Sequence, residues 1–255
     1  MAFSFGYSVF LKDKNLSREL NNQINREIIG NFSKAISKDP YNFLYYIERG
    51  RAKHAYGDYV EAIQDYKNSF SLNPDLKVIF YMANSKYAYG DLEGALKDYE
   101  KLISKNILQE QVFYNIANSQ LILLNYAKAI ENYSKSIEYY QDDSNAYLNR
   151  GNAKFKISDY LGSIKDYEKS IDIYKKSYAV FNNMGVSKFK LKKYRSALED
   201  FKKSLKLNSN NYNTFYNKSL TLFELKEYKK ACIDLKKSIK LGKEIFKDEY
   251  LRICI

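Results

Sequence analysis

A period of 34 residues constrains this chain more than any other feature of its sequence. Six small residues stand 33 or 34 positions apart, and a bulky apolar residue follows each of them four positions later. The six small residues are Ala62, Ala95, Ala129, Ser163, Ala197 and Ala231. Because self-similarity at a fixed period is typical of stacked structural repeats, we expect a tandem array rather than one globular core.

A second column of small residues stands twelve positions before the first column. Its members are Gly50, Ala83, Ala117, Gly151, Gly185 and Ser219. Apolar residues at three- and four-residue spacing on both sides of this column predict two antiparallel helices in each repeat, and the small residue lets them approach closely. For one repeat we predict a first helix over residues 145–157, a turn at 158–159 and a second helix over 160–174.

The repeated pattern is aromatic-x-x-x-small followed by aromatic-x-x-Ala-x-x-x-aromatic, and it resembles the tetratricopeptide repeat (TPR) over residues 43–245. The chain departs from the common pattern because it has no Trp and carries Lys where Tyr is usual. The resemblance implies an all-α, right-handed α-α superhelix (TPR solenoid) of six helix-turn-helix units with capping helices. We expect an N-terminal segment with a capping helix or partial repeat over 1–42, with a helix at 16–38, and a C-terminal capping helix over 246–255.

Lysine and aspartate recur twelve residues apart within the apolar pattern. Four repeats carry both residues: Lys53 and Asp65, Lys86 and Asp98, Lys154 and Asp166, and Lys188 and Asp200. One repeat has neutral Gln120 and Asn132 at the two positions, and the last repeat departs with Leu222 before Asp234. Since the two residues change to neutral ones together, we expect structural ion pairs at the edge of the core rather than ligand contacts.

The resemblance implies that the first helices line an inner groove, where asparagines recur at two positions. These are Asn84, Asn115, Asn118, Asn149, Asn152, Asn183 and Asn217. An asparagine side chain offers a donor beside an acceptor, so such a row can bind the backbone of an extended peptide. The alternative role for these residues is helix packing.

Aromatic and basic residues lie between these asparagines. The aromatic candidates for groove pockets are Phe80, Tyr114, Phe155, Phe189, Tyr216 and Phe223. Their alternative role is to fill the space between neighbouring repeats. Lys156 and Lys190 could receive an acidic side chain or a terminal carboxylate. We therefore expect a non-catalytic adaptor that binds a protein or peptide with acidic residues.

The formal net charge of +12 is unevenly distributed, with −1 over residues 1–143 and +13 over residues 144–255. Several lysines lie at second-helix positions, namely Lys202, Lys203, Lys206, Lys236, Lys237 and Lys240. Clustered lysines can contact phosphates, so binding of nucleic acid or another polyanion through the basic half is the alternative function. A solvated face is the simpler interpretation, because no recognised nucleic-acid motif accompanies these lysines.

Other classes of site find no support in the sequence. There is no phosphate-binding glycine loop and no nucleophile elbow, and the single histidine, His54, is expected in the groove or in packing. We therefore expect no catalytic residues, no metal and no cofactor. Cys232 and Cys254 are interpreted as reduced thiols of a cytoplasmic protein, with a bridge between them as the alternative.

The sequence does not assign a role to residues 1–14 and does not indicate an oligomeric state. No apolar run reaches the length of a membrane span, and the apolar first residues lack the basic segment of a signal peptide. An exported form is the alternative if the start is truncated. The oligomeric state is not indicated, although self-association through an uncapped end would suit a repeat array.

Overall fold

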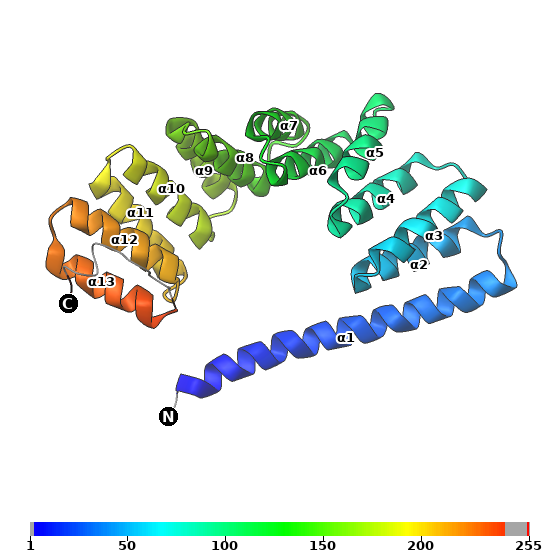
Figure 1. The fold of residues 1–255 in the computed structure, drawn as a ribbon, viewed down its shortest axis with the longest axis horizontal. Helices are drawn as coiled ribbons and strands as arrows, with labels where there is room; N and C mark the ends of the chain where they lie inside the picture. Colours follow the sequence, from blue (N-terminus) through cyan, green and yellow to red (C-terminus); the bar gives the residue numbers. More distant parts are fainter. Residues whose placement is uncertain (1–2, 243–253, 255) are drawn as a thin grey trace. The chain divides into compact units, whose positions relative to one another are not determined.

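The computed structural model describes residues 3–242 and residue 254, with side chains from residue 18 onward. Within this range the chain forms thirteen α-helices and no strand, which confirms the expected all-α fold (Figure 1). The helices belong to two compact units, one extending to Ser119 and the other beginning at Gln120. This boundary falls inside helix α6 (Gln109–Ile122).

The N-terminal unit contains five complete helices and the first part of α6. They are α1 (Phe3–Lys38), α2 (Phe43–Tyr56), α3 (Tyr59–Leu72), α4 (Leu76–Tyr89) and α5 (Leu92–Ser104). Each of α1 to α4 packs against its successor, and Leu102 of α5 shares an apolar cluster with Val112 of α6. α1 is one continuous helix of 36 residues, so the helix expected at 16–38 extends further toward the N-terminus. Its side chains contribute to the first repeat through the half-buried face that meets α2.

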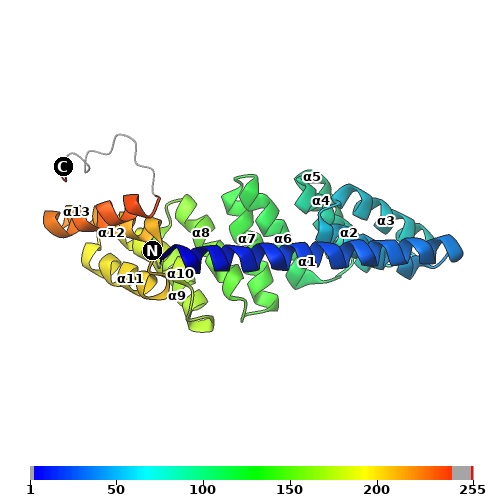
Figure 2. The ribbon, with the colours of Figure 1, turned by 90° about the horizontal axis from the view of Figure 1, so that it is seen from below.

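The C-terminal unit contains the end of α6 and seven further helices. They are α7 (Tyr126–Tyr139), α8 (Ser144–Lys156), α9 (Tyr160–Ile173), α10 (Tyr178–Lys190), α11 (Tyr194–Leu207), α12 (Tyr212–Glu224) and α13 (Tyr228–Lys240). Consecutive helices from α7 to α13 lie side by side (Figures 1 and 2). Apolar clusters centred on Tyr167 and Met184, and on Leu222 and Leu235, join neighbouring pairs. Stacking therefore buries the face that a single helical pair would expose.

The predicted hairpin over 145–174 is observed as α8 and α9, within one residue at all four helix ends. Asp143 begins α8, because its carboxylate accepts from the backbone N–H groups of Asn145 and Ala146. The turn to α9 places Ser158 in the left-handed region, with φ of 64°. The corresponding turns of the first two repeats contain Gly57 and Gly90, for which this conformation is unstrained.

The glycines in the first helices have the packing role predicted from the repeat. A Cβ atom added to Gly151 would lie 2.7 Å from Cε1 of Tyr167, and one added to Gly185 would lie 2.6 Å from Cε1 of Phe201. These aromatic residues are among the most deeply buried in the chain. The two helices of a repeat therefore meet through a ring packed directly on backbone.

The expectation of free thiols is wrong, because Cys232 and Cys254 form a disulfide with their Cα atoms 5.3 Å apart. Cys254 is buried in the cluster that contains Leu222 and Leu235, and this brings it to Cys232 on α13. The capping helix expected over 246–255 lies almost entirely outside the described residues. Among the helices described, none has an apolar stretch that would span a bilayer.

Candidate functional site

The lysines and aspartates that recur twelve residues apart meet in the structure. Lys53, Lys86, Lys154 and Lys188 place Nζ 2.8, 2.5, 2.9 and 2.6 Å from a carboxylate oxygen of Asp65, Asp98, Asp166 and Asp200, respectively. All four carboxylates are buried, at 1–3% relative exposure. Each lysine is only partly buried, so each pair lies at the edge of the core with the cation toward solvent.

Two of these aspartates also bind an arginine that the spacing argument did not include. Arg150 donates from Nε and Nη2 to the two carboxylate oxygens of Asp166, at 3.0 and 2.7 Å. Its Nη1 donates to Ser134 Oγ on α7, at 3.0 Å. Arg49 repeats this arrangement with Asp65 and Ser33 in the N-terminal unit. These arginines tie three consecutive helices together and are structural residues.

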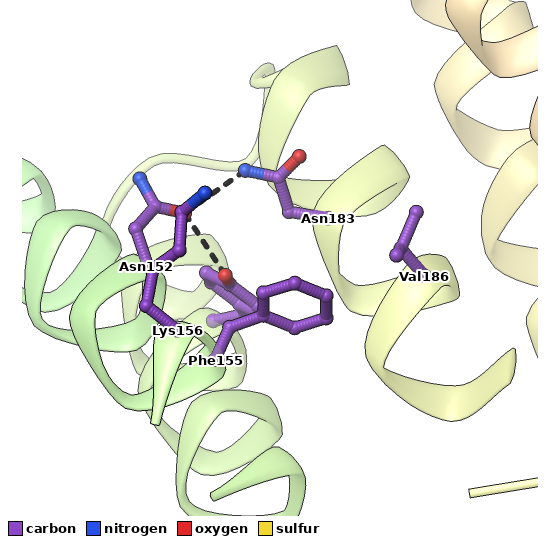
Figure 3. Close-up of a pocket in the computed structure, with 6 residues that line it drawn as sticks. Asn152, Phe155, Lys156, Asn183 and Val186 are labelled. Carbon is purple, nitrogen blue, oxygen red and sulfur yellow. Dashed lines mark hydrogen bonds between the residues drawn. The ribbon is translucent and has the colours of Figure 1, made fainter. Parts of the chain in front are cut away.

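The groove asparagines of the C-terminal unit bind each other and a buried tyrosine. Tyr167 Oη and Asn183 Nδ2 both donate to Asn152 Oδ1, at 2.9 and 3.0 Å. Figure 3 shows the two amides facing each other across the space between α8 and α10. Burial raises the pKa of Tyr167, so its hydroxyl stays protonated and remains a donor.

The same network occurs in the N-terminal unit. Tyr99 Oη and Asn115 Nδ2 both donate to Asn84 Oδ1, at 2.6 and 2.8 Å. The remaining groove asparagines are also half-buried and in contact, namely Asn118, Asn149 and Asn217. The Oδ1 atoms of Asn84 and Asn152 each accept two hydrogen bonds within the protein, so their Nδ2 groups are what remains as potential donors. The asparagine rows hold neighbouring repeats together, whatever else they bind.

Beside this network lies a cavity of about 320 Å³, here called the first pocket. Its lining comprises Asn152, Phe155, Lys156, Tyr167, Asn183 and Val186. Most of these residues come from the first helices α8 and α10, as Figure 3 shows for the five that it labels. Phe155 packs against Tyr160 as a tilted ring pair, with ring centroids 5.3 Å apart. The first pocket therefore combines an apolar wall with amide and hydroxyl groups.

A second pocket of about 160 Å³ follows one repeat later. Its lining residues are Val186, Phe189, Lys190, Phe201, Asn217 and Leu220. Each stands 34 residues after its counterpart in the first pocket, so the two pockets are built from the same six repeat positions. Val186 lies between them and lines both. Four sequence-predicted residues, Phe155, Phe189, Lys156 and Lys190, are brought together with asparagines in these two pockets.

Other candidates lie elsewhere. Phe80 packs against Tyr99 in the N-terminal core, with centroids 6.3 Å apart, and Tyr216 packs in the last apolar cluster. Tyr114 is half-buried. His54 Nδ1 lies 2.8 Å from Ser85 Oγ, and burial lowers its pKa, which favours the neutral ring. No carboxylate accompanies His54 in that contact, so it has the surroundings of a packing residue.

The lysines assigned to the second helices are exposed on α11 and α13. Lys202 forms an ion pair with Glu199 at 2.7 Å, and Lys203 Nζ lies over the ring of Phe181. Lys156 and Lys190 are exposed at the two pockets and, like Lys206 and Lys237, form no ion pair with any described residue. No group of three or more His, Cys, Asp or Glu side chains in the described range could hold a metal ion.

Comparison with protein families identifies the repeat. A family profile described as tetratricopeptide repeat matches residues 178–211, and a second profile with the same description matches residues 212–242. The matched segments are the hairpins α10–α11 and α12–α13. No curated protein matches the chain in sequence.

Several solved structures share the fold. The C-terminal part of a TPR repeat-containing protein from Cytophaga hutchinsonii aligns with a TM-score of 0.75 and 14% identity, over 95% of this chain and 98% of that one. MamA aligns with 0.61 and 17% identity, over 63% and 94%. YrrB, described as a TPR protein with an unusual peptide-binding site, aligns with 0.62 and 16% identity, over 73% and 97%. Residues 178–242 thus match two tetratricopeptide repeats, and the stacked helical hairpins of the chain have the fold of solved tetratricopeptide repeat proteins.

Proposed function

We propose that this protein is a non-catalytic adaptor that binds an extended, acidic peptide segment of a partner protein. The binding surface is the row formed by the first and second pockets on α8, α10 and α12. Tetratricopeptide repeats are protein-interaction scaffolds whose stacked hairpins present extended surfaces for partners. Side chains of the partner enter the pockets, while its backbone runs past the amide of Asn152.

The repetition of the pocket with an unpaired lysine is the observation that carries this proposal. Every buried aspartate of the C-terminal unit has a cation within 3 Å, yet Lys156 and Lys190 have no carboxylate partner among the described residues. Two cations, one beside each apolar cavity, suit a ligand that alternates apolar and acidic side chains. The charge of +13 over residues 144–255 would speed the encounter with such a ligand.

In this proposal the asparagines can form fewer hydrogen bonds with the ligand than a row of asparagines with both amide groups available would form. Because Asn152 Oδ1 already accepts two hydrogen bonds, its amide has only Nδ2 to offer to a ligand. A peptide carbonyl can accept from that group, whereas a peptide N–H cannot find the paired acceptor beside it. Affinity and specificity therefore depend mainly on the pockets and the two lysines.

The test compares two charge reversals of equal size. Lys156→Glu with Lys190→Glu alters the pockets, and Lys206→Glu with Lys237→Glu alters exposed second-helix lysines. A random peptide library displayed on phage is selected with the wild-type protein, and Kd is measured for the enriched peptides. We expect acidic peptides, a loss of about tenfold or more in the pocket variant and a change within about twofold in the control variant.

Equal losses in the two variants would contradict the pocket assignment. The wild-type protein and the two variants are also titrated with a fluorescent single-stranded oligonucleotide at low and high salt. Tight binding that weakens steeply with salt and depends on Lys206 and Lys237 would instead support the polyanion alternative.

A further inference from the structure

The two pockets have the same layout but different chemistry. At the position of Asn152 the second pocket has Val186, and at the position of Tyr167 it has Phe201. The two differences are linked, since the Tyr167 hydroxyl donates to Asn152 and neither Phe201 nor Val186 has a group for such a bond. The exchange therefore removes a complete hydrogen-bonded pair without leaving a buried polar atom unpaired.

The first pocket, which is the more polar of the two, is also the larger. The first pocket has a volume of about 320 Å³ and the second about 160 Å³. Asn152 Nδ2 and the second lone pair of the Tyr167 hydroxyl give the first pocket hydrogen-bonding capacity beyond its lysine. In the second pocket, Val186 and Phe201 replace Asn152 and Tyr167, so that a buried hydroxyl has fewer partners there, Asn217 and Lys190 being the polar residues of the lining.

From these differences we infer that the pockets select different side chains of one ligand: the first pocket binds tyrosine, and the second binds an aliphatic side chain such as leucine. Tyrosine combines a large apolar body with a terminal hydroxyl, which matches the larger cavity and its polar wall. This inference rests on the proposed function and adds the identity of the two anchoring residues. The pair of anchors lets the groove distinguish among acidic peptides, which the two lysines alone would bind with little selectivity.

The test uses the full-length protein and a peptide enriched from the random library. Alanine substitutions in the peptide locate its anchors, and double-mutant cycles with Phe155→Ala and Phe189→Ala assign each anchor to a pocket. At the anchor coupled to Phe155 we expect tyrosine to bind about fivefold more tightly than phenylalanine. At the anchor coupled to Phe189 we expect leucine to bind more tightly than tyrosine.

A double substitution tests the source of this preference. Asn152→Val with Tyr167→Phe gives the first pocket the residues that the second pocket carries at the same positions, and it should abolish the preference for tyrosine over phenylalanine. The matched control is Asn84→Val with Tyr99→Phe, which removes the equivalent hydrogen bond in the N-terminal unit. The control should leave the preference unchanged.

The possible outcomes distinguish failure of this inference from failure of the proposed function. If acidic peptides bind in dependence on Lys156 and Lys190 but the first anchor shows no preference for tyrosine, the inference is wrong and the proposed function stands. If no peptide is enriched, both fall. The preference in the wild-type protein is measured without any substitution, so the inference can be overturned even if the double variant does not fold.

Discussion

Lys218 Nζ lies 2.8 Å from Asp234 Oδ2, so the last repeat neutralises its buried aspartate from a position that the other lysines do not use. Lys218 stands on α12 four residues before Leu222, which occupies the place of Lys154 and Lys188. The pair is nevertheless equivalent to another in the same unit, because Arg150 occupies the repeat position of Lys218 and binds Asp166.

Two positions of the first helix can therefore supply the cation. The earlier position carries, in chain order, Arg49, Met82, Ile116, Arg150, Met184 and Lys218. The later one carries Lys53, Lys86, Gln120, Lys154, Lys188 and Leu222. Every repeat with an aspartate on its second helix has a cation at one position or both. The one repeat without a cation at either position has Asn132 instead. This is the pattern expected if an unpaired buried carboxylate is too costly to keep.

Replacing Lys218 with methionine should destabilise the C-terminal unit by about 3 kcal/mol, because Asp234 is buried and would lose its only cation in the described range. The variant Lys218→Met with Leu222→Lys should recover most of this loss, since it reproduces the arrangement of Met184, Lys188 and Asp200. Urea denaturation followed by circular dichroism measures both changes. Failure of the second lysine to rescue stability would show that the first cost did not come from the unpaired carboxylate.

Glycine at the strained turn of α8 and α9 should stabilise the protein. Ser158 has φ of 64°, a conformation that costs a non-glycine residue about 1 kcal/mol. Ser158→Gly should raise the free energy of unfolding by several tenths of a kcal/mol, after the greater entropy of the unfolded chain is subtracted. Ile157→Gly is the matched control, because Ile157 has φ of −94° and the change should destabilise. Thermal unfolding of the two variants should shift in opposite directions.

Asp200 should make stability depend on pH. Burial raises the pKa of Asp200 above its usual 3.8, against the opposing effect of Lys188. A raised pKa in the folded state means that the contribution is fully present below pH 3.8 and is lost as the pH rises through the folded pKa. Relative to Lys188→Gln with Asp200→Asn, which copies Gln120 and Asn132, the wild-type protein should therefore lose stability as the pH rises from 3.8 through the folded pKa of Asp200.

Urea denaturation at several pH values across this range gives the difference between the two proteins. Glu199 should show the opposite pH dependence. The hydrogen bond from Lys202 lowers the pKa of Glu199, so any contribution of this pair to stability is lost as the pH falls. A difference between wild type and the double variant that does not change with pH would contradict the raised pKa of Asp200.

Reduction of the Cys232–Cys254 bridge should destabilise the C-terminal unit. The bridge closes a loop with a sequence separation of 22 residues. Loop-closure entropy predicts a contribution of about 3 kcal/mol for a loop of this size. Unfolding with and without dithiothreitol, for the wild-type protein and for Cys232→Ser, measures it. The reductant should have no effect on the serine variant, and the two reduced proteins should unfold alike.

Internal comparison explains which features could be predicted from the sequence. Six copies of one pattern reveal the period, the ends of α8 and α9, and the lysine–aspartate pairs, because residues that depend on each other change together between copies. The link between Tyr167 and Asn152 was visible in the same way. At the corresponding places the chain has Phe201 with Val186, and Leu235 with Leu220. Finding this link required a comparison of two repeat positions that lie fifteen residues apart, those of Asn152 and Tyr167.

Features that occur once could not be predicted in this way. The Cys232–Cys254 bridge has no counterpart in another repeat, and two cysteines are too few to indicate a pairing from spacing. The role of Arg150 was missed for a different reason. Only one other repeat has an arginine at that position, and a contact to Ser134 on the preceding hairpin depends on how hairpins stack rather than on the pattern within one of them.

The arginine arrangement has a consequence for how the chain acquires its structure. Arg49 with Asp65 and Ser33 recurs as Arg150 with Asp166 and Ser134, one copy in each compact unit. Each copy fastens three successive helices by contacts that are close together along the chain, and arrays of this kind can nucleate wherever local stability suffices. We therefore expect folding to be able to begin in either unit.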